Sequence, residues 1–150
     1  MKNIIKPGKI LCLDYGKARI GLAISDLSQT IAFPLKVIID KKNLENKISL
    51  LKPIIQEHCI NNIVIGNPLL LNGLKSPLAK EVETFSNLIL INLNIKAILW
   101  DERLSSIEAE KILKQGYVNR KNRTLKIDSI AATLILQSFL STLHATNKQV

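Results

Sequence analysis

The sequence predicts an α/β protein built on a mixed five-stranded sheet with helices on both faces. Three apolar runs separated by short turns occupy the first forty residues, which is typical of an antiparallel meander. Further along, two stretches with helical periodicity are each followed by a short apolar run, which is the pattern of right-handed βα units. The expected sheet is therefore a three-stranded antiparallel meander plus two parallel strands, and a final pair of helices completes the chain.

The meander begins as a hairpin. An apolar run over residues 10–13 ends on Asp14, and Gly16 to Arg19 supply a tight polar turn before the second strand. The third run covers residues 31–39. Pro34 within it predicts an edge position, because proline cannot donate to a strand ladder.

The next helix spans residues 43–59, and its apolar positions recur at the spacing of one helical face. Leu44, Ile48 and Leu51 illustrate this spacing, while Pro53 predicts a kink or a restart. A short buried strand over residues 63–65 and a loop over residues 69–75, turning at Asn72-Gly73, follow.

A second helix begins at Ser76, which serves as N-cap with Pro77 in the first helical position. The last strand covers residues 96–100. A capping box at residues 105–108 opens a helix that ends near Gly116. A polar loop over residues 117–126 and a final helix over residues 127–143 complete the predicted order. No repeat or linker interrupts the chain, so we expect a single domain over residues 1–150.

Composition favours a polyanionic partner. The formal net charge is +9, and 47% of the residues are hydrophobic. This balance suits nucleic acid better than a membrane surface, and no apolar run reaches the length of a membrane span. Cys12 and Cys59 match neither a zinc site nor a disulfide framework, so both are expected to be reduced core residues of a cytoplasmic protein.

Acidic side chains are expected at the carboxyl ends of neighbouring strands, where ligands bind in sheets of this kind. Asp14 ends the first strand, Asp101 and Glu102 follow the last, and Asp128 lies in the first turn of the final helix. Carboxylates gathered in this way suit Mg²⁺ or Mn²⁺ together with a substrate phosphate. The alternatives are a turn-capping Asp14, a solvated pair at residues 101 and 102, and an Asp128 that serves only the helix dipole.

Four ordered stretches of the chain resemble the signature blocks of the YqgF/RuvX family. The stretches are residues 13–26 (LDYGKARIGLAISD), 63–68 (IVIGNP), 101–109 (DERLSSIEA) and 126–132 (KIDSIAA). Their order and spacing also match, and the resemblance covers almost the whole chain. The chain departs from the family pattern at Ala18, at Asn67 and in residues 71–75, which are less acidic than is usual.

The resemblance implies an RNase H-like fold, so that residues 1–150 would form a single RNase H-like nuclease domain. The family is described as Holliday junction resolvases and as nucleases that process the 5′ end of pre-16S ribosomal RNA. By position, Asp14, Glu102 and Asp128 correspond to catalytic acids that use Mg²⁺ or Mn²⁺. The basic residues that also match the blocks, and that are expected to bind substrate, are Arg19, Arg103 and Lys126.

The choice between Asp101 and Glu102 does not follow from strand parity, because both faces of the preceding strand are largely apolar. The longer reach of glutamate and the family resemblance favour Glu102. Asp101 is then expected to point away and to pair with a basic group or cap backbone amides.

The function expected from these observations is a metal-dependent endonuclease that acts on structured nucleic acid, with pre-16S rRNA as substrate. The basic loop would hold the phosphate backbone through Arg120, Lys121, Arg123 and Lys126. The alternatives are a Holliday junction resolvase, a non-cleaving rRNA-binding factor and, much less favoured, an actin-like phosphotransferase. A monomer and a homodimer are both compatible with the sequence.

Overall fold

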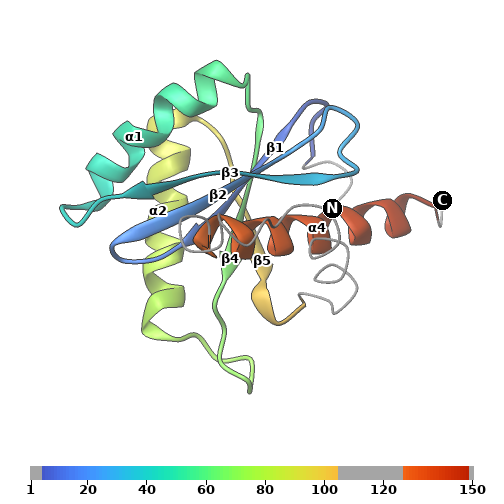
Figure 1. Ribbon diagram of the computed structural model, residues 1–150. Coiled ribbons are helices and arrows are strands. Elements are labelled where there is room, and N and C mark those ends of the chain that lie inside the picture. Colours follow the sequence, from blue (N-terminus) through green and yellow to red (C-terminus); the bar gives the residue numbers. More distant parts are fainter. Residues whose placement is uncertain (1–4, 105–126, 149–150) are drawn as a thin grey trace.

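The computed structural model describes residues 5–104 and 127–148, which form one mixed sheet with helices on both faces (Figure 1). The strands are β1 (Ile10–Tyr15), β2 (Arg19–Ser25), β3 (Ala32–Ile39), β4 (Asn62–Asn67) and β5 (Ile98–Asp101). They lie in the order β3-β2-β1-β4-β5. The pairs β1–β2 and β2–β3 are antiparallel, whereas β1–β4 and β4–β5 are parallel. The predicted meander with two added parallel strands is confirmed.

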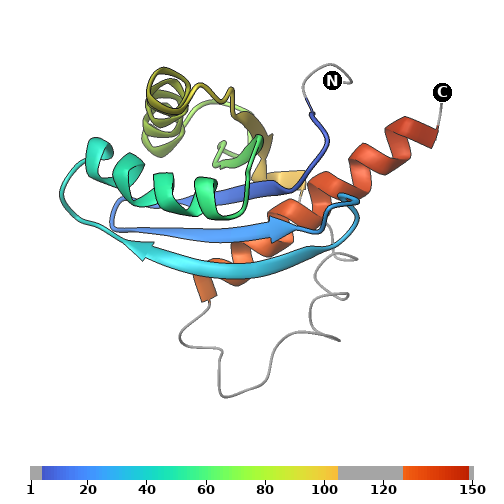
Figure 2. The same ribbon diagram turned by 90° about the horizontal axis from the view of Figure 1, so that it is seen from above.

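The helices are α1 (Leu44–Glu57), α2 (Pro77–Leu93) and α4 (Ile127–Lys148), and a short 3₁₀ turn, η1 (Glu102–Leu104), follows β5. Seen from above, α1 and α2 cover one face of the sheet and α4 crosses the other (Figure 2). Two hydrophobic layers result, because successive strand residues point to opposite faces. Leu13 and Ile65 face α1 and α2, whereas Cys12 and Val64 face α4.

The face covered by α4 carries the functional side chains described below. Phe139 of α4 packs edge-on against Trp100 of β5, with ring centroids 5.2 Å apart. Gln137 fixes the helix to the start of β3, accepting from the Ala32 amide at 3.0 Å and donating to the Thr30 carbonyl at 3.1 Å. The helix is thereby held across the sheet in one orientation.

Local sequence explains where the first two helices begin. Asn43 accepts from the amide of Asn46 at 2.8 Å and caps α1, and Ser76 accepts from the amide of Ala79 at 3.0 Å and caps α2. The helix α1 continues through Pro53, so the alternative of a restart is not observed.

The edge position predicted from Pro34 is confirmed. This residue lies in β3, the outermost strand beside β2, and the register shifts opposite it between Leu22 and Ala23. A proline is tolerated there because the outer side of the strand has no ladder to complete.

The prediction that both cysteines are core residues is half wrong. Cys12 is fully buried, whereas Cys59 is exposed. Cys59 adopts a left-handed conformation, with φ of 52°, in the turn that ends α1, and this turn directs its side chain away from the core. The strand predicted at residues 63–65 extends over Asn62–Asn67.

The helix predicted at residues 105–116 and the basic loop at residues 117–126 lie outside the described residues. Within the described ranges, none of the helices has both the length and the apolar content needed to cross a membrane.

Candidate active site

The carboxyl ends of β1, β4 and β5 meet at one edge of the sheet, because these three neighbouring strands run parallel. Asp14 lies near the end of β1, Gly66 near the end of β4, and Glu102 directly after β5. Asp14 and Gly66 share the strand parity of Cys12 and Val64, whose side chains face α4. Three sequence segments more than thirty residues apart thus contribute to one site.

Asp14 and Glu102 form the centre of this site. Their carboxyl groups share a hydrogen bond, although 88 sequence positions separate them. Two ionised carboxylates at such a distance repel each other, so a proton or a cation must lie between them. The chemistry of the pair is therefore compatible with either a shared proton or a bound cation.

Gly66 makes this contact possible. A Cβ at residue 66 would lie 2.6 Å from Oε1 and 3.0 Å from Cγ of Glu102, and 2.9 Å from Cδ1 of Ile135 on α4. The two shorter distances are below those that real Cβ atoms show, so a side chain at residue 66 would displace the end of Glu102 or of Ile135, and glycine leaves the glutamate its place between β4 and α4. Sequence reasoning missed this role, although the Gly66-Asn67-Pro68 stretch was available as a signal.

Burial dominates the electrostatics of the pair. Removal from solvent raises the pKa of Glu102 above its ordinary value, and the charge of Asp101 raises it further, while the hydrogen bond from Asp14 opposes both. Cys12 lies in the layer that faces α4, near enough for the charges of Asp14 and Glu102 to act on its thiol. Burial raises the pKa of the Cys12 thiol strongly, and the charges of Asp14 and Glu102 add to the effect. The thiol is therefore held neutral.

Asp101 points away from this pair, as predicted. Its carboxylate accepts from Nε of Arg103 at 3.0 Å and from Nη2 at 2.6 Å, and it also accepts from the Arg103 amide at 3.0 Å. The hydrogen bonds from the Arg103 side chain hold the pKa of Asp101 below its ordinary value. The expectation that Asp101 pairs with a basic group or caps backbone amides is confirmed, since it accepts from both the side chain and the amide of Arg103.

Arg19 lies on the same face of the sheet as Asp14. Asp14 is opposite Gly21 in the antiparallel register, and Arg19 is two residues from Gly21 at the start of β2. The side chain is exposed, and with Asp14 and Gly16 it lines a pocket at the β1–β2 turn. This position is suitable for contact with a phosphate beside the carboxyl pair.

The remaining predicted residues are only partly placed. Asp128 is the second residue of α4, and its side chain lies outside what the structure describes. Arg120, Lys121, Arg123 and Lys126 also lie outside the described residues.

The donors present fit a divalent metal. Asp14 and Glu102 offer hard carboxylate oxygens, which are the ligands preferred by Mg²⁺ and Mn²⁺. In the part of the chain that is described, no three acidic, histidine or cysteine side chains are arranged so that together they could hold a metal ion.

Asn67 is a further polar residue at this edge. Its Oδ1 is buried without a hydrogen-bond partner among the described residues, and its strand parity directs it to the face opposite Asp14. It therefore does not join the carboxyl pair.

Comparison with known proteins agrees with this geometry. A protein of Protochlamydia amoebophila named "Putative pre-16S rRNA nuclease" is 42% identical over 146 residues, covering 93% of this chain and 97% of the relative. A protein of the same name from Chlamydia abortus is 46% identical over 132 residues, covering 87% and 88%. One from Carboxydothermus hydrogenoformans is 41% identical, covering 89% and 96%.

Among solved structures, the chain is similar to Thermus thermophilus RuvC in complex with a Holliday junction substrate. The TM-score is 0.62 at 9% identity, and the match covers 90% of this chain and 96% of RuvC. A second structure of T. thermophilus RuvC gives a TM-score of 0.53 at 8% identity. These likenesses confirm the predicted RNase H-like fold. The family model described as "RuvX: Holliday junction resolvase" matches residues 8–142, and the chain belongs to this family.

Proposed function

We propose that the protein is a metal-dependent endonuclease that hydrolyses phosphodiester bonds in structured nucleic acid, with the 5′ region of pre-16S rRNA as its substrate. The observation that carries this proposal is the half-buried carboxyl pair of Asp14 and Glu102, held together across the space left by Gly66. Membership of a resolvase family and the nuclease names of the relatives support the same chemistry.

Asp14, Glu102 and Asp128 are proposed to hold Mg²⁺ or Mn²⁺ at the edge of the sheet. When bound there, such an ion lowers the pKa of water and neutralises charge that develops on the phosphate. The two described carboxylates orient the site, and the apolar layer below them, with its neutral Cys12, keeps bulk water away.

Basic side chains are proposed to hold the nucleic-acid backbone around this centre. Arg19 is exposed on the face of Asp14 and would contact a phosphate beside the site. The residues proposed to extend this contact are Arg120, Lys121, Arg123 and Lys126. We further propose that residues 1–150 act as one nuclease domain in the cytoplasm, as a monomer or a homodimer.

A Holliday junction resolvase is the second candidate, which the description of the family model favours. A resolvase that cuts two symmetric strands is expected to act as a dimer. A non-cleaving rRNA-binding factor is the third, and it would retain the fold and the basic surface without turnover.

The test is a side-by-side incubation of purified protein with a 5′-labelled pre-16S rRNA fragment and a labelled four-way DNA junction. Each substrate is assayed with Mg²⁺, with Mn²⁺ and with chelator, and Asp14→Asn is the matched control. Cleavage of RNA that needs metal and disappears in the control supports the proposal. Cleavage of the junction alone favours the resolvase, and RNA binding without cleavage by any metal would favour the binding factor.

A further inference from the structure

The loop between β4 and α2 exposes three leucine side chains next to the candidate site. Leu70, Leu71 and Leu74 are 47%, 96% and 62% exposed, and we refer to them together as the leucine tip. Isolated exposed leucines are common, but three within five residues form a local apolar surface. A ligand that covers this surface would have to offer apolar area.

The loop that carries the leucine tip has a defined conformation. Leu70 donates to the Leu74 carbonyl at 2.9 Å, and Gly73 donates to the Leu70 carbonyl at 2.8 Å. Gly73 has a φ of 82°, which glycine adopts without strain, and Leu69 bridges to Lys75 at the base of the loop. The turn that carries the three leucines is thus held in place by its own backbone hydrogen bonds.

Arg103 connects this turn to the active-site edge. Its Nη1 donates to the carbonyls of Leu71 at 3.2 Å and Leu70 at 3.4 Å, while Asp101 holds the other side of the guanidinium. A planar guanidinium with several fixed donors suits this double contact, and the ammonium of lysine cannot reproduce it. Since Arg103 directly follows Glu102, the loop is tied to the segment that supplies the carboxylate.

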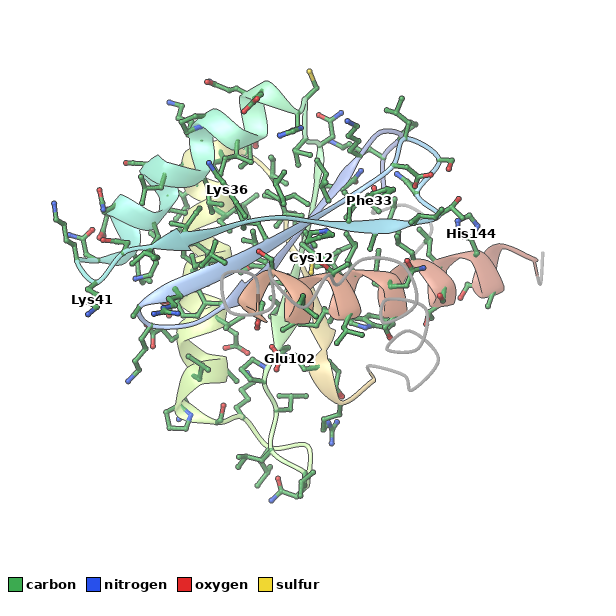
Figure 3. All side chains as sticks on the ribbon, in the orientation of Figure 1. Cys12, Phe33, Lys36, Lys41, Glu102 and His144 are labelled. Atoms are coloured by element: carbon green, nitrogen blue, oxygen red, sulfur yellow. The ribbon has the colours of Figure 1, made fainter. Side chains whose placement is uncertain are left out.

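The chemistry of the loop suits nucleic acid. Residues 69–75 contain no acidic side chain that would repel phosphate. Among the aromatic residues that the structure describes, Phe33 on the outer strand β3 is the exposed one, and Figure 3 shows it far from Glu102. Apolar contact with bases near the site therefore falls to the leucines, and leucine is a side chain that proteins use as a wedge against base steps.

We propose that the leucine tip contacts unpaired bases of the substrate beside the scissile phosphate, and that Arg103 is a positioning residue that holds residues 69–75 for this contact. The inference rests on the proposed nuclease function and assigns Arg103 a role through the loop in place of direct phosphate binding.

The test measures RNA affinity in chelator, where no cleavage is needed. The probes are a labelled hairpin with unpaired bases beside the expected cut and a fully paired RNA of equal length. Leu71→Ser with Leu74→Ser should weaken hairpin binding about tenfold, because two exposed leucines lose their apolar contact. Binding of the fully paired RNA should be unchanged.

The matched control is Leu90→Ser with Ile91→Ser on α2, which also removes two exposed apolar side chains. Ile91 lies 14 helical residues beyond Pro77, about 21 Å from the loop end of the helix. This control should change affinity by less than about twofold. Equal losses in the two pairs, or no loss at the tip, would overturn the proposal.

Arg103→Gln removes both the double contact with the loop and the positive charge, so it separates positioning from phosphate contact. If Arg103 acts through the loop, combining it with the leucine pair adds no further loss, and the dependence of binding on salt keeps its slope. If the losses of affinity from the Arg103 variant and the leucine pair multiply, or if the slope of log K against log salt falls by the amount of about one counterion, Arg103 binds phosphate directly. Cleavage by the wild-type protein is assayed separately, so failure of the nuclease proposal remains distinguishable from failure of this one.

Discussion

Glu102 fills the space that a side chain on Gly66 would need, since a Cβ on residue 66 would lie 2.6 Å from Oε1 of the glutamate. Because Gly66 on β4 has no side chain, Glu102, which follows β5, can reach across β4 to Asp14 on β1. The site therefore depends on a residue that has no functional group.

Gly66→Ala is expected to displace Glu102 from Asp14, because the far end of the flexible glutamate moves more easily than the strand. Metal-dependent cleavage should fall by about a hundredfold, as expected when a positioning contact is lost by about 1 Å. The variant should remain folded. Titration calorimetry with Mn²⁺ and thermal denaturation check both parts, and an alanine variant with wild-type Mn²⁺ affinity would contradict the proposed crowding.

Asp14→Asn and Glu102→Gln should each abolish metal-dependent cleavage while the protein stays folded. Each substitution keeps the shape of the side chain and removes one negative charge from the cation site. Single-turnover cleavage at saturating Mn²⁺ and far-UV circular dichroism are the measurements. Near-normal turnover in either variant would remove that residue from the proposed metal site.

Asp101→Asn should instead lower stability by about 1 kcal/mol, because the side chain caps the amide of Arg103. Cleavage at saturating RNA should persist. Urea denaturation paired with a cleavage assay tests this difference from Glu102→Gln. An inactive but fully stable Asp101→Asn protein, with Glu102→Gln active, would reverse the assignment of the two acids.

Neutralising Arg120, Lys121 and Arg123 together should weaken RNA binding and reduce its dependence on salt. Each lost phosphate contact lowers the slope of log K against log salt by roughly 0.7–0.9, so the three substitutions lower it by up to about three times this amount. Affinity measured across a salt series provides the slope. An unchanged slope would mean that these residues form a solvated connector.

Asp26 should give the fold a measurable acid sensitivity. Burial raises its pKa, but hydrogen bonds from the Ser28 hydroxyl and the amides of Ile31 and Thr30 outweigh this and leave the pKa below its ordinary value. A depressed carboxyl pKa adds stability above the unfolded value, near pH 4, and this stability is lost as the pH falls through the folded value. Asp26→Asn should therefore unfold more easily than wild type at pH 7, and the difference should shrink below about pH 4. Urea midpoints at pH 7 and pH 3 test this, and a constant difference would contradict it.

Local patterns were sufficient to predict most of the sheet. Apolar runs and turn residues identify the strands. Pro34 places β3 at the edge of the sheet, because a residue without an amide proton is tolerated only where no neighbouring strand needs it. The order of elements then brings Asp14 and Glu102 to one edge. The reach of glutamate and the family resemblance, rather than parity, selected Glu102 over Asp101.

The features that escaped prediction depend on contacts between distant segments. Gly66 acts through a space that exists only when β4, α4 and Glu102 are assembled. The contact between Arg103 and residues 70 and 71 likewise joins backbone carbonyls to a side chain 32 residues away, which no local pattern encodes. Cys59 was misplaced because the left-handed turn after α1 has no glycine to announce it.

The rates at which the two cysteines react with a thiol reagent can report the opening of α4 from the sheet. Cys59 is exposed and should react with a thiol reagent at once, whereas Cys12 lies under α4 with no exposed surface. Its raised pKa also keeps the thiol from ionising while it is covered. The slow phase of labelling, from Cys12, therefore reports the rate of openings that uncover this thiol. The fast phase, from Cys59, serves as an internal reference in the same sample.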